Sequence, residues 1–251
     1  MPTRYLTQKF GPEHIAQAAE LLAQRHARHR AVWPGLDRRY EDPSNCAPLI
    51  NERLQQQGSV GAAAVSDGHV AGYVLMTPKT DSTWGANAWA EDAGSAGDGE
   101  ALRVAYAAIA GNLVDAGVRG HWAMVPASDA ELVEAWFSMS FGVQHDYALS
   151  APVGTDFQPR IPDGLTIRRP TRADIPVLAE LDLVLPNHVH QAPVFSTLGI
   201  PSMEETVAEL TEDFDDPKYS VWVAEHDGQI VSELVGVNIH DSHSWPRPVR
   251  A

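Results

Sequence analysis

The spacing of apolar residues predicts alternating strands and helices in the first 150 residues. A stripe at helical spacing runs through segment 99–117, and its members are Leu102, Tyr106, Ile109, Leu113 and Ala116. Gly117 follows the stripe and is a typical C-terminal cap. ANAWAED (86–92) and RGHWAMVPA (119–127) read as short strands. A mixed sheet flanked by helices is therefore the expected α/β fold.

Two further elements are expected before residue 150. Ser128 and Glu131 have the spacing of a capping box, which predicts that a helix begins there. The apolar positions of this helix are Leu132, Val133, Trp136 and Phe137. VQHDYALS (143–150) then predicts a closing strand.

The chain repeats its own opening. LTQKFGPEHIAQAAELL starts at Leu6 and LTIRRPTRADIPVLAELDL starts at Leu165. A shift of 160 brings Ile15 onto Ile175 and carries Asp67-Gly68 onto Asp227-Gly228. An Asp-Gly pair between two β-rich runs is typical of a tight hairpin. We therefore interpret the chain as a duplication in which each copy opens with a strand, a helical region and a hairpin.

The two copies are separated by a segment without periodicity. APVGTDFQPRIPD (151–163) contains three prolines and is typical of a linker. The predicted domains are therefore 1–150 and 164–251. Only NIHDSHSWPRPVRA follows the second hairpin, so the second domain is expected to be a partial copy whose apolar hairpin face stays uncovered. The second half would then be the less stable one and open at lower free energy than the first, or it would dock on the first half or on another copy of the chain, as in a homodimer.

Composition narrows the class of partner. The formal net charge of −15 works against nucleic acid and anionic membrane surfaces. No apolar run approaches the length of about 18 residues that a membrane helix requires. Cys46 is the single cysteine, so no disulfide framework is expected. These features predict a cytoplasmic protein.

The order of elements and two local motifs resemble the GNAT superfamily of N-acetyltransferases. The family's Arg/Gln-x-x-Gly-x-Gly/Ala loop follows a central strand, and GSAGDG (94–99) stands at that place in this chain. The family's Tyr-x-x-x-Gly-Phe helix end corresponds to WFSMSF (136–141). The resemblance covers residues 5–150, its opening third recurs in 164–239, and the layout is similar to the tandem two-domain actinobacterial type.

The resemblance implies a GNAT-like acyl-CoA N-acyltransferase fold, acetyl-CoA as co-substrate and an amine on a small molecule or peptide as acceptor. The residues that it implies for acetyl-CoA binding are Trp89, Ala90, Gly94, Gly97, Asp98, Gly99, Glu100 and Ala101. Gly94 replaces the family's Arg or Gln, which removes one phosphate-facing side chain. Asp98 and Glu100 either repel a pyrophosphate or only complement the helix dipole.

The resemblance also implies where the acid and base of an acyl transfer would stand. The family's tyrosine, which protonates the leaving thiolate, is replaced by Trp136, whose indole N–H has negligible acidity. Candidate bases are Glu91 at the end of a strand and His121 on the next strand. Each has a non-catalytic alternative. A carboxylate at a strand end, such as Glu91, is often only solvated, and a lone histidine, such as His121, is often a hydrogen-bonded packing residue.

Other constellations have weaker support. The pairs His26/His29, His188/His190 and His240/His243 lack a cysteine or a zinc motif, so no metal site is expected. QRHARHR (24–30) is interpreted as the polar face of a helix. HDSHS (240–244) holds the residue types of a hydrolase triad without a nucleophile elbow, and is interpreted as a polar tail. The alternative to acetyl transfer is a non-catalytic acyl-CoA-binding or interaction module.

Overall fold

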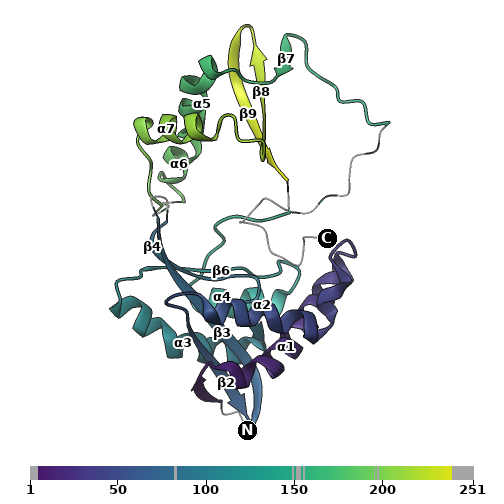
Figure 1. Cartoon of the computed structure of the whole chain (residues 1–251), viewed down its shortest axis with the longest axis vertical. Helices are drawn as coiled ribbons and strands as arrows, with labels where there is room; N and C mark the ends of the chain where they lie inside the picture. Colours follow the sequence, from purple (N-terminus) through teal and green to yellow (C-terminus); the bar gives the residue numbers. More distant parts are fainter. Residues whose placement is uncertain are drawn as a thin grey trace. The chain divides into compact units, whose positions relative to one another are not determined.

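The chain forms two compact units (Figure 1). A computed structural model describes residues 5–81, 84–148, 150, 154, 156–194, 196 and 198–238. Unit 1 contains the described residues up to 81 and from 86 to 148, and unit 2 contains those from 150 onward together with 84–85.

Unit 1 is built on a six-stranded sheet. The strands are β1 (Leu6–Lys9), β2 (Val60–Ser66), β3 (His69–Asp81), β4 (Gly85–Ala90), β5 (Ser95–Gly97) and β6 (Gly120–Ala123). Their order is β1-β2-β3-β4-β6, and β5 also pairs with β3. Strands β1, β2 and β3 are antiparallel neighbours, whereas β4 and β6 are parallel. The prediction of a mixed sheet is therefore confirmed.

Helices cover both faces of this sheet. They are α1 (Ile15–Val32), α2 (Pro43–Gln55), α3 (Gly99–Asp115) and α4 (Ala130–Ser138), with short 3-10 turns at Pro12–His14 and Arg38–Glu41. Alternate side chains of β2 and β3 separate into two cores. Ala63 and Tyr73 pack with α1 and α2, and Ala62 and Val74 pack with α3 and α4. The core is thus divided by the sheet.

The sequence located most elements of unit 1 but misplaced two. The helix over 99–117 and the strands in 86–92 and 119–127 are confirmed as α3, β4 and β6. The cap of α4 is Asp129, whose carboxylate accepts from the Leu132 amide at 3.3 Å, and not Ser128. The closing strand is wrong, because residues 143–148 form no strand. Val143 is 69% exposed there, so its apolar side chain buries no face.

Unit 2 is a smaller α/β unit. Its strands β7 (Leu165–Arg168), β8 (Tyr219–His226) and β9 (Gln229–Val237) form an antiparallel sheet in that order. A 3-10 turn at Arg172–Asp174 leads into α5 (Ile175–Asp182), which is followed by α6 (Val184–Val189) and α7 (Met203–Asp213). Among its described residues, the buried side chains are Ile175, Leu178, Ala179, Thr206 and Val223.

The repeated hairpins share detailed geometry. Asp67 and Asp227 both have φ of 51°, and the glycines after them have φ of 80° and 78°. Both hairpins are therefore turns with two left-handed residues, as the Asp-Gly pairs predict. Each also has a register shift at the same offset, between Ala64/Val65 and between Ala224/Glu225. The repeat thus extends from sequence to backbone conformation.

Candidate functional site

The site that the sequence indicated lies where β4 parts from β6. Parallel pairing of these strands ends at Ala90 and Ala123, and the last bond runs from the Met124 amide to the Ala90 carbonyl at 2.9 Å. The chain then forms a turn at 91–94, which we call the bulge, and continues as β5 on β3. Beyond Ala90 the two strands therefore diverge.

The carbonyls of this bulge are bonded inward. The Gly94 amide donates to the Glu91 carbonyl, and Leu75 donates to the Gly94 carbonyl, both at 2.7 Å. The Tyr73 hydroxyl donates to the Ala93 carbonyl at 3.0 Å. Arg25 donates to the carbonyl of Asp92 and, at 2.5 Å, to that of Ser95. The bulge is thereby fixed against β3 and α1.

Arg25 corrects the interpretation of QRHARHR as a polar face. Arg25 and His26 are buried within unit 1, with 6% and 4% of their surface exposed. Burial lowers the pKa of Arg25, although the nearby Asp92 opposes that shift. His26 Nε2 forms a hydrogen bond with the backbone carbonyl of Asp37 at 2.8 Å, so this ring nitrogen is already used within the fold. Arg25 and His26 thus hold loops from inside, whereas Gln24 and Arg28 of the same run are exposed.

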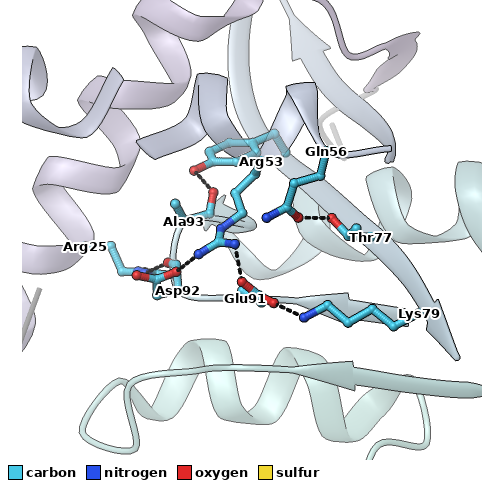
Figure 2. Close-up of polar contacts among 9 residues, drawn as sticks. Arg25, Arg53, Gln56, Thr77, Lys79, Glu91, Asp92 and Ala93 are labelled. Carbon is cyan, nitrogen blue, oxygen red and sulfur yellow. Dashed lines mark hydrogen bonds and ion pairs between the residues drawn. The ribbon is translucent and has the colours of Figure 1, made fainter. Parts of the chain in front are cut away.

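Glu91 lies in a charged cluster with Arg53 of α2 and Lys79 of β3 (Figure 2). One Glu91 oxygen pairs with Arg53, and the other lies 2.5 Å from the Lys79 ammonium. Arg53 also reaches the Asp92 carboxylate at 3.4 Å. Both oxygens of Glu91 therefore have cationic partners. A substrate that binds Glu91 must displace one of these two partners.

His121 is bonded through both ring nitrogens. Its Nε2 lies 3.3 Å from the Val118 carbonyl, which can only accept, so we assign the ring proton to Nε2. Nδ1 then accepts from the Tyr106 hydroxyl at 2.7 Å. Burial raises the pKa of Tyr106, which keeps this hydroxyl protonated. The sequence had placed Tyr106 only in the apolar stripe of α3.

Glu91 and His121 belong to opposite faces of the sheet. Ala88 lies opposite His121 in the register and packs with α3 and α4. Strand alternation turns Trp89 and Trp122 to the other face, where their rings stack at 5.7 Å. Glu91 bonds α2 on that same side. The two candidate bases therefore do not form one acid–base pair.

The late helix ends as the motif implies, with different residues. Trp136 is buried and packs edge-on against Tyr106 and Phe141, at 5.7 and 4.7 Å between ring centroids. Ser140 stands at the motif's glycine and has φ of 68°, while the Phe141 amide donates to the Trp136 carbonyl at 3.3 Å. The left-handed turn is thus kept without glycine. Trp136 brings no hydroxyl, but it touches Tyr106, which has one.

The glycines of the GSAGDG loop face protein atoms. A Cβ on Gly94 would lie 2.8 Å from the Leu75 carbonyl oxygen, so the bulge leaves no room for the family's Arg or Gln. Gly97 has φ of 132°, and a Cβ there would lie 2.3 Å from the Ala71 carbonyl oxygen. A Cβ on Gly99 would lie 2.8 Å from Ala135 of α4. These glycines permit close packing of strand and helices.

Asp98 is the N-cap of α3. Its Oδ1 accepts from the Ala101 amide at 2.8 Å, and its Oδ2 accepts from the Tyr5 hydroxyl at 2.8 Å. Glu100 forms two hydrogen bonds with Arg103, at 2.6 and 2.8 Å, and these bonds lower the pKa of Glu100. The N-terminus of α3 is therefore already capped by the carboxylate of Asp98, and Arg103 is paired with the carboxylate of Glu100.

Side chains that could ligate a metal are scattered over the described part of the chain. No three His, Cys, Asp or Glu side chains there gather as metal ligands would. His240/His243 and HDSHS lie outside the described residues. None of the described helices combines the length and apolar character of a membrane span.

The sequence is matched by no protein-family model and by no curated protein. Some solved structures are similar to part of this chain. An aminoglycoside N-acetyltransferase, AAC(6')-Iy in complex with CoA, is 14% identical over 61% of this chain and 97% of its own, with a TM-score of 0.41. A probable acetyltransferase is 14% identical over 61% and 99%, with a TM-score of 0.38. Both TM-scores lie below 0.5, so these similarities support no conclusion about activity.

Proposed function

We propose that unit 1 transfers an acyl group, acetyl in the simplest case, from a CoA-type thioester to an amine where β4 diverges from β6. The observation that carries this proposal is the divergence after Ala90, with a carboxylate on one face of the sheet and a hydroxyl–imidazole pair on the other. Acyl transfer needs two substrates held in line, and two faces that meet at a break in the sheet supply that arrangement.

The amine would bind on the face of Glu91. Lys79 already places an ammonium 2.5 Å from this carboxylate, and the Lys79 side chain is 45% exposed. A substrate ammonium has the same charge and the same donors as Lys79, so it can take the place of Lys79 at Glu91. The acceptor class that fits is a primary amine of a small molecule or peptide.

The thioester would approach from the face of Tyr106 and His121. In the reaction, the amine nitrogen bonds to the carbonyl carbon and the carbon–sulfur bond breaks. The ammonium loses two protons in all, of which one ends on the thiol sulfur and the other leaves to solvent. The Tyr106 hydroxyl, whose hydrogen is held by His121 Nδ1, is the proposed donor: it would turn that hydrogen to the leaving sulfur, and the tyrosinate would then take up, through solvent, one of the two protons that the ammonium loses.

A second candidate is a non-catalytic acyl-CoA-binding or interaction module. It is favoured by the engagement of both Glu91 oxygens and both His121 nitrogens within unit 1. The two candidates differ in turnover, because only the first releases thiol when an amine is added.

The test is a thiol-release assay with acetyl-CoA and S-acetyl-pantetheine across a panel of primary amines. Amine-dependent release is expected, and Glu91→Gln and Tyr106→Phe should each lower kcat by about 10-fold or more. Glu131→Gln, an exposed acid on α4, is the control and should keep kcat. Buried Cys46, whose pKa burial raises to about 11, should add little thiol background. No amine-dependent release with either thioester would leave the non-catalytic module.

A further inference from the structure

We propose, building on the acyl transfer above, that unit 1 recognises its donor by the uncharged acyl-pantetheine arm and gains no affinity from a diphosphate. The feature that points to this is Asp98, which stands where the GSAGDG loop would be expected to hold a pyrophosphate. The substrate class is then an acyl thioester of pantetheine, either free or as part of CoA.

Asp98 occupies the positive end of α3. A helix N-terminus carries the equivalent of about half a positive charge, and Asp98 sets a full negative charge on the same point. Its two oxygens are bonded to Ala101 and Tyr5, each at 2.8 Å, so the carboxylate is held at that place. A phosphate oxygen aimed at the Ala101 amide would have to displace it.

The two spaced glycines of the loop pack against neighbouring elements. The Gly97 backbone lies against β3, since a Cβ there would meet the Ala71 carbonyl oxygen and the Gly72 Cα at 2.3 Å. The Gly99 backbone lies against α4, since a Cβ there would meet Ala135. At both glycines the space on the Cβ side is therefore filled by protein atoms and not left for a ligand.

Two described cations of the neighbouring helices are paired with acids. Arg103 of the first turn of α3 forms two bonds to Glu100. Arg28 pairs at 3.0 Å with Asp129, the N-cap of α4. The formal net charge of −15 also works against binding of a diphosphate. A pantetheine thioester is uncharged and meets none of this repulsion.

The experiment compares binding of three ligands to the full chain by calorimetry and thermal shift at low ionic strength. The ligands are acetyl-CoA, S-acetyl-pantetheine and adenosine 5′-diphosphate 3′-phosphate, which carries the diphosphate without the pantetheine arm. We expect the two thioesters to bind with Kd values within about threefold, and the nucleotide to give no shift. A Kd for acetyl-CoA that is 10-fold or more below that of S-acetyl-pantetheine would overturn the inference while leaving the acyl transfer intact. Binding of neither thioester would overturn both.

A charge variant tests the cause. Asp98→Asn keeps an N-cap side chain of the same shape and removes the charge. It should lower the Kd for acetyl-CoA by about two- to fivefold and leave that for S-acetyl-pantetheine unchanged. Asp115→Asn removes the same charge at the far end of α3, about 25 Å away by helix rise, and should change neither. An unchanged Kd for acetyl-CoA in Asp98→Asn would show that this carboxylate does not exclude the diphosphate.

Discussion

Arg25 is the residue on which the geometry of the proposed site depends. It is buried, and it donates to two carbonyls of the segment that leads from β4 into β5. Its Nε has no partner among the described residues. Burying a guanidinium costs folding free energy. We infer that leaving the two carbonyls buried without hydrogen-bond donors would cost more.

Replacement of Arg25 should therefore cost far more than replacement of the next arginine on the same helix. Arg25→Met leaves the carbonyls of Asp92 and Ser95 buried without these donors, and the expected loss of unfolding free energy is about 3 kcal/mol or more. Arg28→Met removes one ion pair of a side chain that is 55% exposed, and should cost below about 1 kcal/mol. Urea unfolding of both variants measures the difference. Equal losses would show that Arg25 does not hold the bulge.

Single residues were also where sequence reasoning had the least power. Glu91 was identified because a strand end is visible in the sequence, but Arg53 and Lys79 come from distant elements and carry no local signal. Arg25 sits in a basic run that reads as solvated, and only the fold shows that it points inward. Tyr106 was predicted as an apolar stripe residue, because helical spacing does not reveal a histidine on the adjacent strand.

At the scale of elements, α5 and β9 meet through a pair of acids. Glu233 of β9 lies opposite buried Val223 in the register, on the face that packs against helices. The pKa of Glu233 is raised to about 7, chiefly by burial. Asp182, at the end of α5, adds to this shift through a side-chain hydrogen bond and through its negative charge. The folded form thus retains a proton at pH values where an unfolded glutamate has lost it.

The stability of unit 2 should therefore fall as the pH rises. Glu233 has its ordinary pKa near 4.5 when unfolded, so its unfavourable contribution appears above pH 4.5 and is complete above about 7. Glu233→Gln should raise the Tm of unit 2 at pH 8 and flatten its fall between pH 5 and 8. Exposed Glu209→Gln on α7 is the control. An unchanged pH dependence in Glu233→Gln would show that the proton is not retained.

Elements were better predicted than contacts. Asp67-Gly68 and Asp227-Gly228 predicted both hairpins, because a turn with two left-handed residues selects its own sequence. The stripe of α3 predicted this helix, which ends at Asp115 with Ala116 as its C-cap, and Gly117, expected as the cap, follows with φ of 85°. The strand expected at 143–150 failed because alternation over a few residues does not require a partner, and Val143 and Tyr147 are exposed.

At the scale of the whole chain, unit 2 matches the opening of unit 1 in three respects. These are the order of elements, the conformation of the hairpin turn and the position of the register shift within the hairpin. We infer that the two share an origin by duplication. The matched positions differ in burial. Val74 is fully buried beneath α3, whereas Leu234, 160 residues later, is 67% exposed. Ala62 is 3% exposed and Trp222 is 41% exposed, with the Arg169 guanidinium 4.0 Å from its ring centroid.

These matched strands should differ in hydrogen exchange. Amides of β8 and β9 are covered on one face, whereas those of β2 and β3 lie between two cores, so exchange in the former needs a smaller opening. We expect the slowest amides of 219–237 to open at a free energy lower by about 2 kcal/mol or more than those of 60–76. Native-state exchange on a sample verified as monomeric gives both values in one experiment.

Two variants of unit 2 serve as controls. Leu234→Thr alters an exposed side chain and should leave the opening free energies unchanged. Val223→Thr should speed exchange in β8 and β9, because Val223 is 1% exposed. Equal protection of the two hairpins in a monomer would mean that the exposed face of unit 2 costs it no stability.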